Sequence, residues 1–144
     1  RYAVLVPGCS LAKPEKRWPA ENFAALARRF YDSNISVVLT GTVADSDAVE
    51  MVQSLMPDAI NLCGKTTIAD LAKLYASAVS IVGNDTGPIF LAAASGAPTI
   101  MVMGPDTHPS MSAPTGPCCD WLKGAPITKV SVDDVWHALQ RFTT

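Results

Sequence analysis

The chain has 144 residues, enough for one domain with a substantial hydrophobic core. Hydrophobic residues make up 49% and charged residues 17%, which is typical of a globular α/β protein and argues against disorder. The formal net charge of −2 gives no general attraction to nucleic acid, so any anionic ligand must be held by local groups.

Short apolar runs alternate with stretches of helical periodicity along the chain. Most of these runs are nearly continuous in apolar residues, as expected for strands covered on both faces. They predict strands at residues 2–7, 36–40, 59–62, 79–82, 99–103 and, more weakly, 127–130. Apolar residues at helical spacing predict helices around 23–30, 49–56, 71–75, 89–95 and 135–142. This alternation predicts an α/β fold with a doubly wound parallel sheet and right-handed crossovers.

Helix start signals precede several of these segments, and one segment has none. Three patterns resemble capping boxes with Asp in the last position, and a proline precedes the first helix. These residues are Thr42 with Asp45, Thr67 with Asp70, Ser131 with Asp134, and Pro19. Residues 104–126 instead contain five prolines, so we expect mostly loop there. A loop of that length in a compact domain is usually functional.

The cysteines predict neither a zinc site nor a disulfide framework. The four are Cys9, Cys63, Cys118 and Cys119, with no C-x-x-C pair and no histidine at zinc-finger spacing. Reduced thiols of an intracellular protein are the simplest interpretation, and a strained bond between Cys118 and Cys119 is the alternative. We therefore predict no metal and no cofactor.

Glycine-bearing turns follow four of the predicted strands. They lie at residues 7–10, 40–42, 83–88 and 104–106. Ligands of open parallel sheets bind outside the carboxyl ends of the strands. Several such turns on one rim therefore predict a ligand site there.

The turn after the fourth strand contains Asp85, Thr86, Gly87 and Pro88, and it has three interpretations. An aspartic protease needs a second carboxylate of the same kind, and a helix follows here instead. Asp85 could simply cap that helix, with Pro88 in its first turn. The small residues that follow also suit a free helix N-terminus, where the backbone amides of Thr86 and Gly87 would attract phosphate.

A basic turn follows the first strand. Its residues Lys13, Lys16, Arg17 and Trp18 form either a solvated surface turn or a cap over an anionic ligand. The two histidines stand alone: we expect His137 on the surface of the last helix, and His108 lies in the long loop near the rim.

These motifs, taken in order, resemble the carboxyl-terminal half of the heptosyltransferase family of glycosyltransferases. The matching stretches are Val6-Pro7-Gly8, Lys16-Arg17-Trp18-Pro19, Val38-Leu39-Thr40-Gly41, Asn61-Leu62-Cys63-Gly64-Lys65-Thr66, Gly83-Asn84-Asp85-Thr86-Gly87-Pro88, Ala92-Ala93-Ala94 and Gly104-Pro105. The resemblance implies a GT-B architecture, in which two Rossmann-like lobes enclose the active site. Residues 1–144 would then be the lobe that binds the nucleotide-sugar donor, and the amino-terminal, acceptor-binding lobe would be absent.

The resemblance also implies which residues hold the donor, typically ADP-heptose. Lys16 and Arg17 would contact the donor phosphates, and Thr86 and Gly87 would bind the pyrophosphate at the helix terminus. Asp85 would hold the donor sugar, and Thr40 and Gly41 would lie near the nucleoside.

The implied reaction is an inverting transfer of heptose to the lipopolysaccharide inner core. Its general base is expected on the absent lobe, which would also hold the glycolipid acceptor, so this chain alone would bind the donor without turnover. The implied location is cytoplasmic, with peripheral attachment to the inner membrane. One departure is Phe90, where the family usually has histidine. Another nucleotide-sugar enzyme, such as a different glycosyltransferase or an epimerase, and a non-catalytic binding domain remain alternatives.

Overall fold

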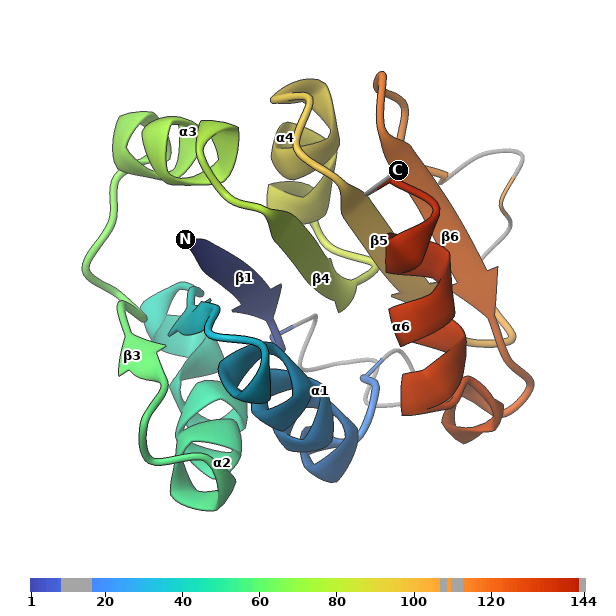
Figure 1. The fold of residues 1–144 in the computed structure, drawn as a ribbon, viewed down its shortest axis with the longest axis horizontal. Coiled ribbons are helices and arrows are strands. Elements are labelled where there is room, and N and C mark those ends of the chain that lie inside the picture. Colours follow the sequence, from blue (N-terminus) through green and yellow to red (C-terminus); the bar gives the residue numbers. More distant parts are fainter. Residues whose placement is uncertain (9–16, 107–108, 110–112, 143–144) are drawn as a thin grey trace.

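One sheet of six parallel strands forms the centre of the molecule (Figure 1). The computed structural model describes residues 1–8, 17–106, 109 and 113–142. The strand order is β3-β2-β1-β4-β5-β6, so the direction of winding reverses between β1 and β4. Ligands of doubly wound folds bind at such a reversal. The strands are β1 (Tyr2–Val6), β2 (Ser36–Leu39), β3 (Ile60–Asn61), β4 (Ser80–Asn84), β5 (Thr99–Met103) and β6 (Cys119–Lys123).

Helices cover both faces of the sheet, as a doubly wound fold requires. The front layer in Figure 1 consists of α1 (Ala20–Asp32), α2 (Ser46–Leu55) and α6 (Val132–Gln140), and the rear layer of α3 (Ile68–Ala76) and α4 (Gly87–Ala94). Successive strand residues point to opposite faces, so Leu5 packs in the front core and Val4 in the rear core. This is why the strands are apolar throughout rather than alternating.

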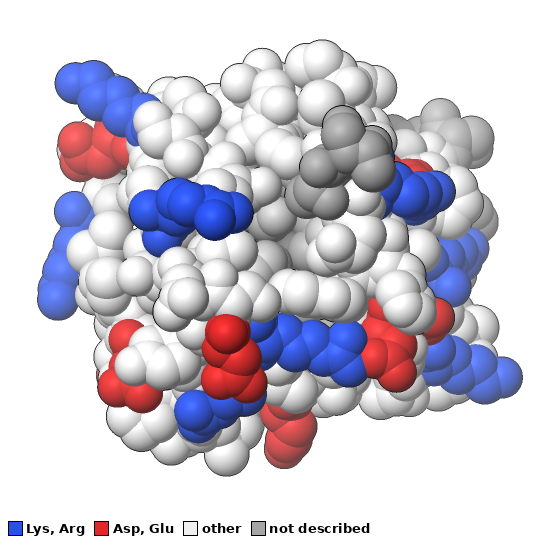
Figure 2. Space-filling model, viewed as in Figure 1, with Lys and Arg blue, Asp and Glu red and all other residues white. Residues whose placement is uncertain are grey.

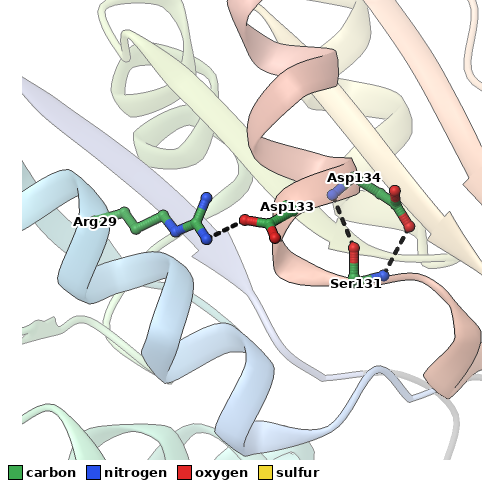
Figure 3. Close-up of polar contacts among 4 residues, drawn as sticks. All are labelled: Arg29, Ser131, Asp133 and Asp134. Atoms are coloured by element: carbon green, nitrogen blue, oxygen red, sulfur yellow. Dashed lines mark hydrogen bonds and ion pairs between the residues drawn. The ribbon is translucent and has the colours of Figure 1, made fainter.

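The front layer is held together by apolar packing and by polar links between helices. The buried stripe of α1 consists of Phe23, Ala24, Leu26, Ala27 and Phe30. The Arg29 guanidinium of α1 pairs with the Asp133 carboxylate in the first turn of α6 (Figure 3). Beside this pair, Ser131 and Asp134 form the capping box that begins α6, with both hydrogen bonds at 3.0 Å.

Most elements predicted from the sequence are confirmed. The first five strands lie where the apolar runs placed them, with ends shifted by at most two residues. The capping boxes of Thr67 and Ser131 begin α3 and α6, and Pro19 is the N-cap of α1. The box of Thr42 opens a 3-10 turn, Val43–Asp45, and α2 follows that turn directly.

Two predictions for the carboxyl-terminal third were wrong. Residues 119–123 were expected to be loop, yet they form the edge strand β6, because the eight residues between Pro117 and Pro126 contain no proline and pair with β5. The weak strand at 127–130 is instead a 3-10 turn, Ile127–Lys129. Ile127 and Val130 are both buried in the front core, a spacing of three that suits a helical turn and would place them on opposite faces of a strand.

Charged side chains are mixed on the face shown in Figure 2, where acidic and basic groups alternate along the lower edge. Arg141 pairs with Asp120 at 2.6 Å, in addition to the pair between Arg29 and Asp133. None of the helices in the described residues is long and apolar enough to cross a bilayer.

Candidate functional site

A hollow lies at the carboxyl edge of the sheet, where the turn after β2 faces the first turns of α3 and α4. It is lined by Thr40, Gly41, Thr42, Val43, Gly64, Thr66, Ile68, Leu71, Tyr75 and Pro88. Val43 and Ile68 on its walls are each 77% exposed, so apolar side chains stand open to solvent at its mouth. A hollow with apolar walls and a few hydroxyl groups suits a flat, partly polar ligand such as a nucleoside.

Two buried hydroxyl groups stand at the wall of this hollow. The side-chain oxygens of Thr40 and Tyr75 lie 3.3 Å apart, and both residues are almost completely buried. Burial raises the pKa of the Tyr75 phenol above its ordinary value, so this group stays protonated near neutral pH. The hydroxyl of Thr40 is therefore already engaged inside the protein, whereas Gly41 lines the hollow without a side chain of its own.

The turn after β2 is fixed from both sides. The Gly64 amide, at a φ of 72°, donates to the Gly41 carbonyl at 2.8 Å. On the other side, Asp45 accepts hydrogen bonds from the amide and hydroxyl of Thr42 at 2.9 and 3.1 Å. Its carboxylate also lies against Gly8, where an added Cβ would be 2.3 Å from it. Asp45 thus links the turns that follow β1 and β2.

The first turn of α4 begins beside the hollow. Thr86 is the N-cap residue, so the alternative interpretation in which Asp85 caps this helix was wrong. Thr86 makes no side-chain cap bond to α4, and an added Cβ on Gly87 would meet nothing within 4 Å of it among the described residues. Among the described residues, no side chain therefore caps the first amides of α4, and Pro88 in the first turn costs no hydrogen bond.

Asn84 closes the winding reversal between β1 and β4. It is the last residue of β4 and has 0% exposure. Its Nδ2 donates to the Pro7 carbonyl at 2.8 Å, and its Oδ1 accepts from the Trp18 amide at 2.9 Å. The end of β4 is therefore tied both to the exit of β1 and to the entry of α1.

The basic turn is only partly described, and Trp18 does not face a ligand. The Trp18 ring is buried against Phe23 at 5.0 Å, and its Nε1 donates to the Val130 carbonyl at 2.8 Å. The idea that Trp18 covers an anion was therefore wrong. Arg17 lines a different, mostly apolar hollow between α1 and α2. Lys13 and Lys16 lie outside the described residues.

The predicted donor-binding residues are partly assembled by the fold. Thr40 and Gly41 line the hollow, which reaches α4 at Pro88, directly after Thr86 and Gly87 in the chain. Arg17 borders the other hollow, while Lys16 lies outside the described residues. Phe90 is 39% exposed on the same side of α4 as Gly87, at a spacing of three residues.

Three residues at this edge were not predicted to contribute to a site: Asp45, Tyr75 and Asn84. Asp45 carried only its capping signal, and Tyr75 fitted the apolar stripe of its helix. Asn84 had one detectable signal, since an amide at the end of a buried strand needs partners for two polar groups.

Cysteine and histidine positions add little to the site. Cys63, Cys118 and Cys119 are free thiols, and Cys9 lies outside the described residues. Burial raises the pKa of Cys63, which disfavours the reactive thiolate. His137 is exposed on α6 as predicted, whereas His108 is outside the described part of the chain. Within the described ranges, no group of three or more His, Cys, Asp and Glu side chains is arranged to hold a metal ion.

Comparison with known proteins identifies the family. The family model of glycosyltransferase family 9 (heptosyltransferase) matches residues 1–120. The chain therefore belongs to glycosyltransferase family 9.

Individual relatives agree with this assignment. Over 113 residues the chain is 33% identical to lipooligosaccharide heptosyltransferase 2 of Haemophilus influenzae, a match that covers 75% of this chain and 32% of the relative. It is 34% identical over 106 residues to lipopolysaccharide heptosyltransferase 2 of Escherichia coli K12, covering 70% of this chain and 30% of the relative. The chain thus spans about a third of the length of these relatives.

Solved structures show the same fold. ADP-heptose lps heptosyltransferase II of E. coli superposes with a TM-score of 0.86 at 23% identity, over 99% of this chain and 47% of that one. The E. coli heptosyltransferase WaaC, solved with ADP, gives a TM-score of 0.84 at 24% identity, over 97% of this chain and 43% of that one. At these identities the likeness supports the fold alone.

Proposed function

We propose that this chain is the carboxyl-terminal, donor-binding lobe of a GT-B heptosyltransferase that transfers heptose from ADP-heptose to the lipopolysaccharide inner core. The observation that carries the proposal is the continuous edge formed by the hollow after β2 and the open first turn of α4. Relatives named as lipopolysaccharide and lipooligosaccharide heptosyltransferases support the reaction. Similar structures solved with ADP and with ADP-2-deoxy-2-fluoro heptose support the donor.

Each part of the edge suits one part of a nucleoside diphosphate sugar. The nucleoside would lie in the hollow against Gly41 and beside the buried Thr40, between the apolar walls of Val43 and Ile68. Asp45 joins this set as a ligand of the ribose hydroxyls, because an acidic residue after the second strand does this in doubly wound folds.

The diphosphate would lie at the winding reversal. The backbone amides of Thr86 and Gly87, the Thr86 hydroxyl and the dipole of α4 would bind it from one side. Lys16 and Arg17 would supply positive charge from the basic turn. Asp85 carries the wrong charge for phosphate, so its role would be to hold hydroxyls of the donor sugar.

The chemistry we propose is an inverting displacement. An acceptor hydroxyl attacks the anomeric carbon while the bond to the diphosphate breaks, and a general base removes the hydroxyl proton. The base and the glycolipid acceptor would belong to the amino-terminal lobe. The lobe described here would stabilise the departing diphosphate through its cations and helix amides. Because the relatives' names place them in lipopolysaccharide synthesis, we propose a cytoplasmic enzyme peripheral to the inner membrane.

Calorimetric titration of the chain with ADP, UDP, GDP and ADP-heptose tests the donor assignment. We expect ADP and ADP-heptose to bind selectively, and Lys16→Ala and Thr86→Ala to weaken that binding. Lys73→Ala is the matched control, since Lys73 also lies on α3 but is not among the residues that line the hollow.

The alternatives predict different results. Selective binding of UDP or GDP would keep the site and change the enzyme to another nucleotide-sugar transferase or an epimerase. Binding of ADP that is indifferent to Lys16→Ala and Thr86→Ala would contradict the assigned phosphate contacts. Binding of no nucleotide would contradict the proposed donor lobe as a free-standing binding unit.

A further inference from the structure

The strongest polar cross-link in the described residues that the donor assignment leaves unused is the one made by Asn84. A single buried side chain bonds the backbone at two places, the Pro7 carbonyl and the Trp18 amide. Both backbone groups lie outside regular secondary structure, after β1 and before α1. They therefore depend on Asn84, rather than on a strand or helix partner, for these bonds.

The chemistry of the side chain fits this double role. An amide offers a donor and an acceptor on one planar group, so it satisfies a carbonyl and an N–H at once. A carboxylate could accept from Trp18, but it would face the Pro7 carbonyl with a second acceptor and carry a buried charge. An aliphatic residue would leave both backbone groups without these partners.

The position of this cross-link gives it consequences for ligand binding. Trp18 is already fixed through its ring, which packs on Phe23 and donates to Val130. The bond from Asn84 adds a second anchor at its backbone, immediately after Arg17. On the other side, Asn84 leads through Asp85 into Thr86 and Gly87, the first residues of α4.

We propose that Asn84 is a positioning residue that holds the Trp18 backbone, and with it Arg17, in register with the first turn of α4. It touches no ligand itself. By fixing the backbone beside Arg17 relative to Thr86, it lets cations and helix amides act on the same diphosphate. This part of the inference rests on the proposed donor function, whereas the anchoring of Trp18 does not.

The test compares Asn84→Ala with a control of similar kind. Thr99→Val also removes a buried side-chain hydrogen bond, from the Thr99 hydroxyl to the Ala97 carbonyl at 2.8 Å, at the opposite end of the neighbouring strand. Both variants should lower stability. Only Asn84→Ala should increase hydrogen exchange at the Trp18 amide, measured by NMR without nucleotide.

Nucleotide binding provides the second readout. We expect ADP affinity to fall about tenfold in Asn84→Ala, the scale of one lost interaction, and to change less than about twofold in Thr99→Val. In a background carrying Lys16→Ala and Arg17→Ala, Asn84→Ala should cost much less affinity, because it acts through those residues. Fully additive effects would overturn the positioning role.

The two readouts separate this inference from the proposed function. Unchanged exchange at Trp18 in Asn84→Ala refutes the anchoring, whatever the affinity. Faster exchange with unchanged ADP affinity confirms the anchor and refutes its role in binding. If the unmodified chain binds no ADP, the donor function fails and the link to a ligand falls with it, while exchange at Trp18 still decides whether Asn84 holds the turn.

Discussion

Helices α1 and α4, on opposite faces of the sheet, bury different kinds of side chain. The front layer of α1, α2 and α6 packs large groups such as Phe23, Phe30 and Val135. Among the described residues the rear layer has the helices α3 and α4, and the buried face of α4 is small, with Ala92 and Ala93 beside Ile89. The large apolar groups of the front helices contribute strongly to packing, while the small ones of α4 let that helix approach the strands. Stability and ligand binding should therefore be separable by mutation.

The largest effect is expected in the front layer. Phe30→Ala should cost about 3–5 kcal/mol of unfolding free energy, because the Phe30 ring is buried and packs on Trp136 at 5.3 Å. Urea unfolding measures the loss, and ADP titration should show unchanged affinity for the folded fraction.

A matched change in the rear layer should behave differently. Ile89→Ala should also destabilise, by about 2–5 kcal/mol, and it should weaken ADP binding because Ile89 seats the first turn of α4. Equal losses of affinity in Phe30→Ala and Ile89→Ala would show that the two layers are not separable.

Two glycines of the rear layer give a finer test. A Cβ on Gly83 would lie 2.6 Å from the Ile89 Cδ1 and 2.8 Å from the Val6 Cβ. Gly83→Ala should therefore overpack the core and lower the unfolding free energy by about 1–3 kcal/mol. The Cβ of Gly87→Ala would meet nothing within 4 Å among the described residues, so this variant should change stability by less than about 1 kcal/mol.

Gly87→Ala should nevertheless weaken ADP binding, because its methyl group would occupy the place where phosphate approaches the helix amides. Thermal unfolding and calorimetry on the two variants separate these effects. Full ADP affinity in Gly87→Ala would argue that the diphosphate lies elsewhere on the edge.

Tyr75, at the wall of the hollow, should make the unfolding free energy depend on pH in the alkaline range. Burial raises the folded-state pKa of Tyr75 above the value of about 10 in an unfolded chain. The resulting stability is complete below pH 10 and is lost as pH rises from there through the folded-state pKa. Tyr75→Phe should therefore flatten the alkaline decline in unfolding free energy. Tyr31→Phe, at an exposed ring, is the control, and an equal flattening there would contradict the assignment.

Most of this architecture could be predicted from the sequence because strands buried on both faces have an almost entirely apolar composition. Runs such as residues 2–7 are apolar throughout, and only a strand covered on both faces requires that. The edge strand β6 lacked this signal, since one side of it faces solvent and prolines flank it. Its pairing with β5 depends on tertiary context, which propensity does not contain.

The site was less predictable than the fold. Thr40 and Gly41 were found because turns at the carboxyl ends of parallel strands gather at one edge. The roles of Asp45 and Asn84 depend on contacts with Gly8, Pro7 and Trp18, which are distant in sequence. No local pattern encodes such contacts. Capping by Asp85 was an alternative because aspartate caps well, yet the N-cap is Thr86, one residue later, and the helix begins at Gly87.

The smallest expected effect concerns the ion pair between Arg29 and Asp133, far from the hollow on the front layer. The hydrogen bond and charge of Arg29 lower the pKa of Asp133 below its ordinary value near 3.8. Any stability from this pair is present above pH 4 and disappears as pH falls through the lowered pKa. Because both groups are exposed, Arg29→Gln should change unfolding free energy little at neutral pH.

NMR titration of the carboxyl groups gives the direct measurement for this pair. In Arg29→Gln the pKa of Asp133 should rise toward 3.8, while that of Asp70 should stay low, since the Thr67 backbone and hydroxyl lower it instead. Thr67→Ala should raise the pKa of Asp70 and leave Asp133 unchanged. A shift of both carboxyl groups in Arg29→Gln would mean that the mutation disturbs the fold beyond the front layer. A mutation in the front layer would then affect a hydrogen bond in the rear layer, and stability could not be separated from ligand binding by mutating one layer.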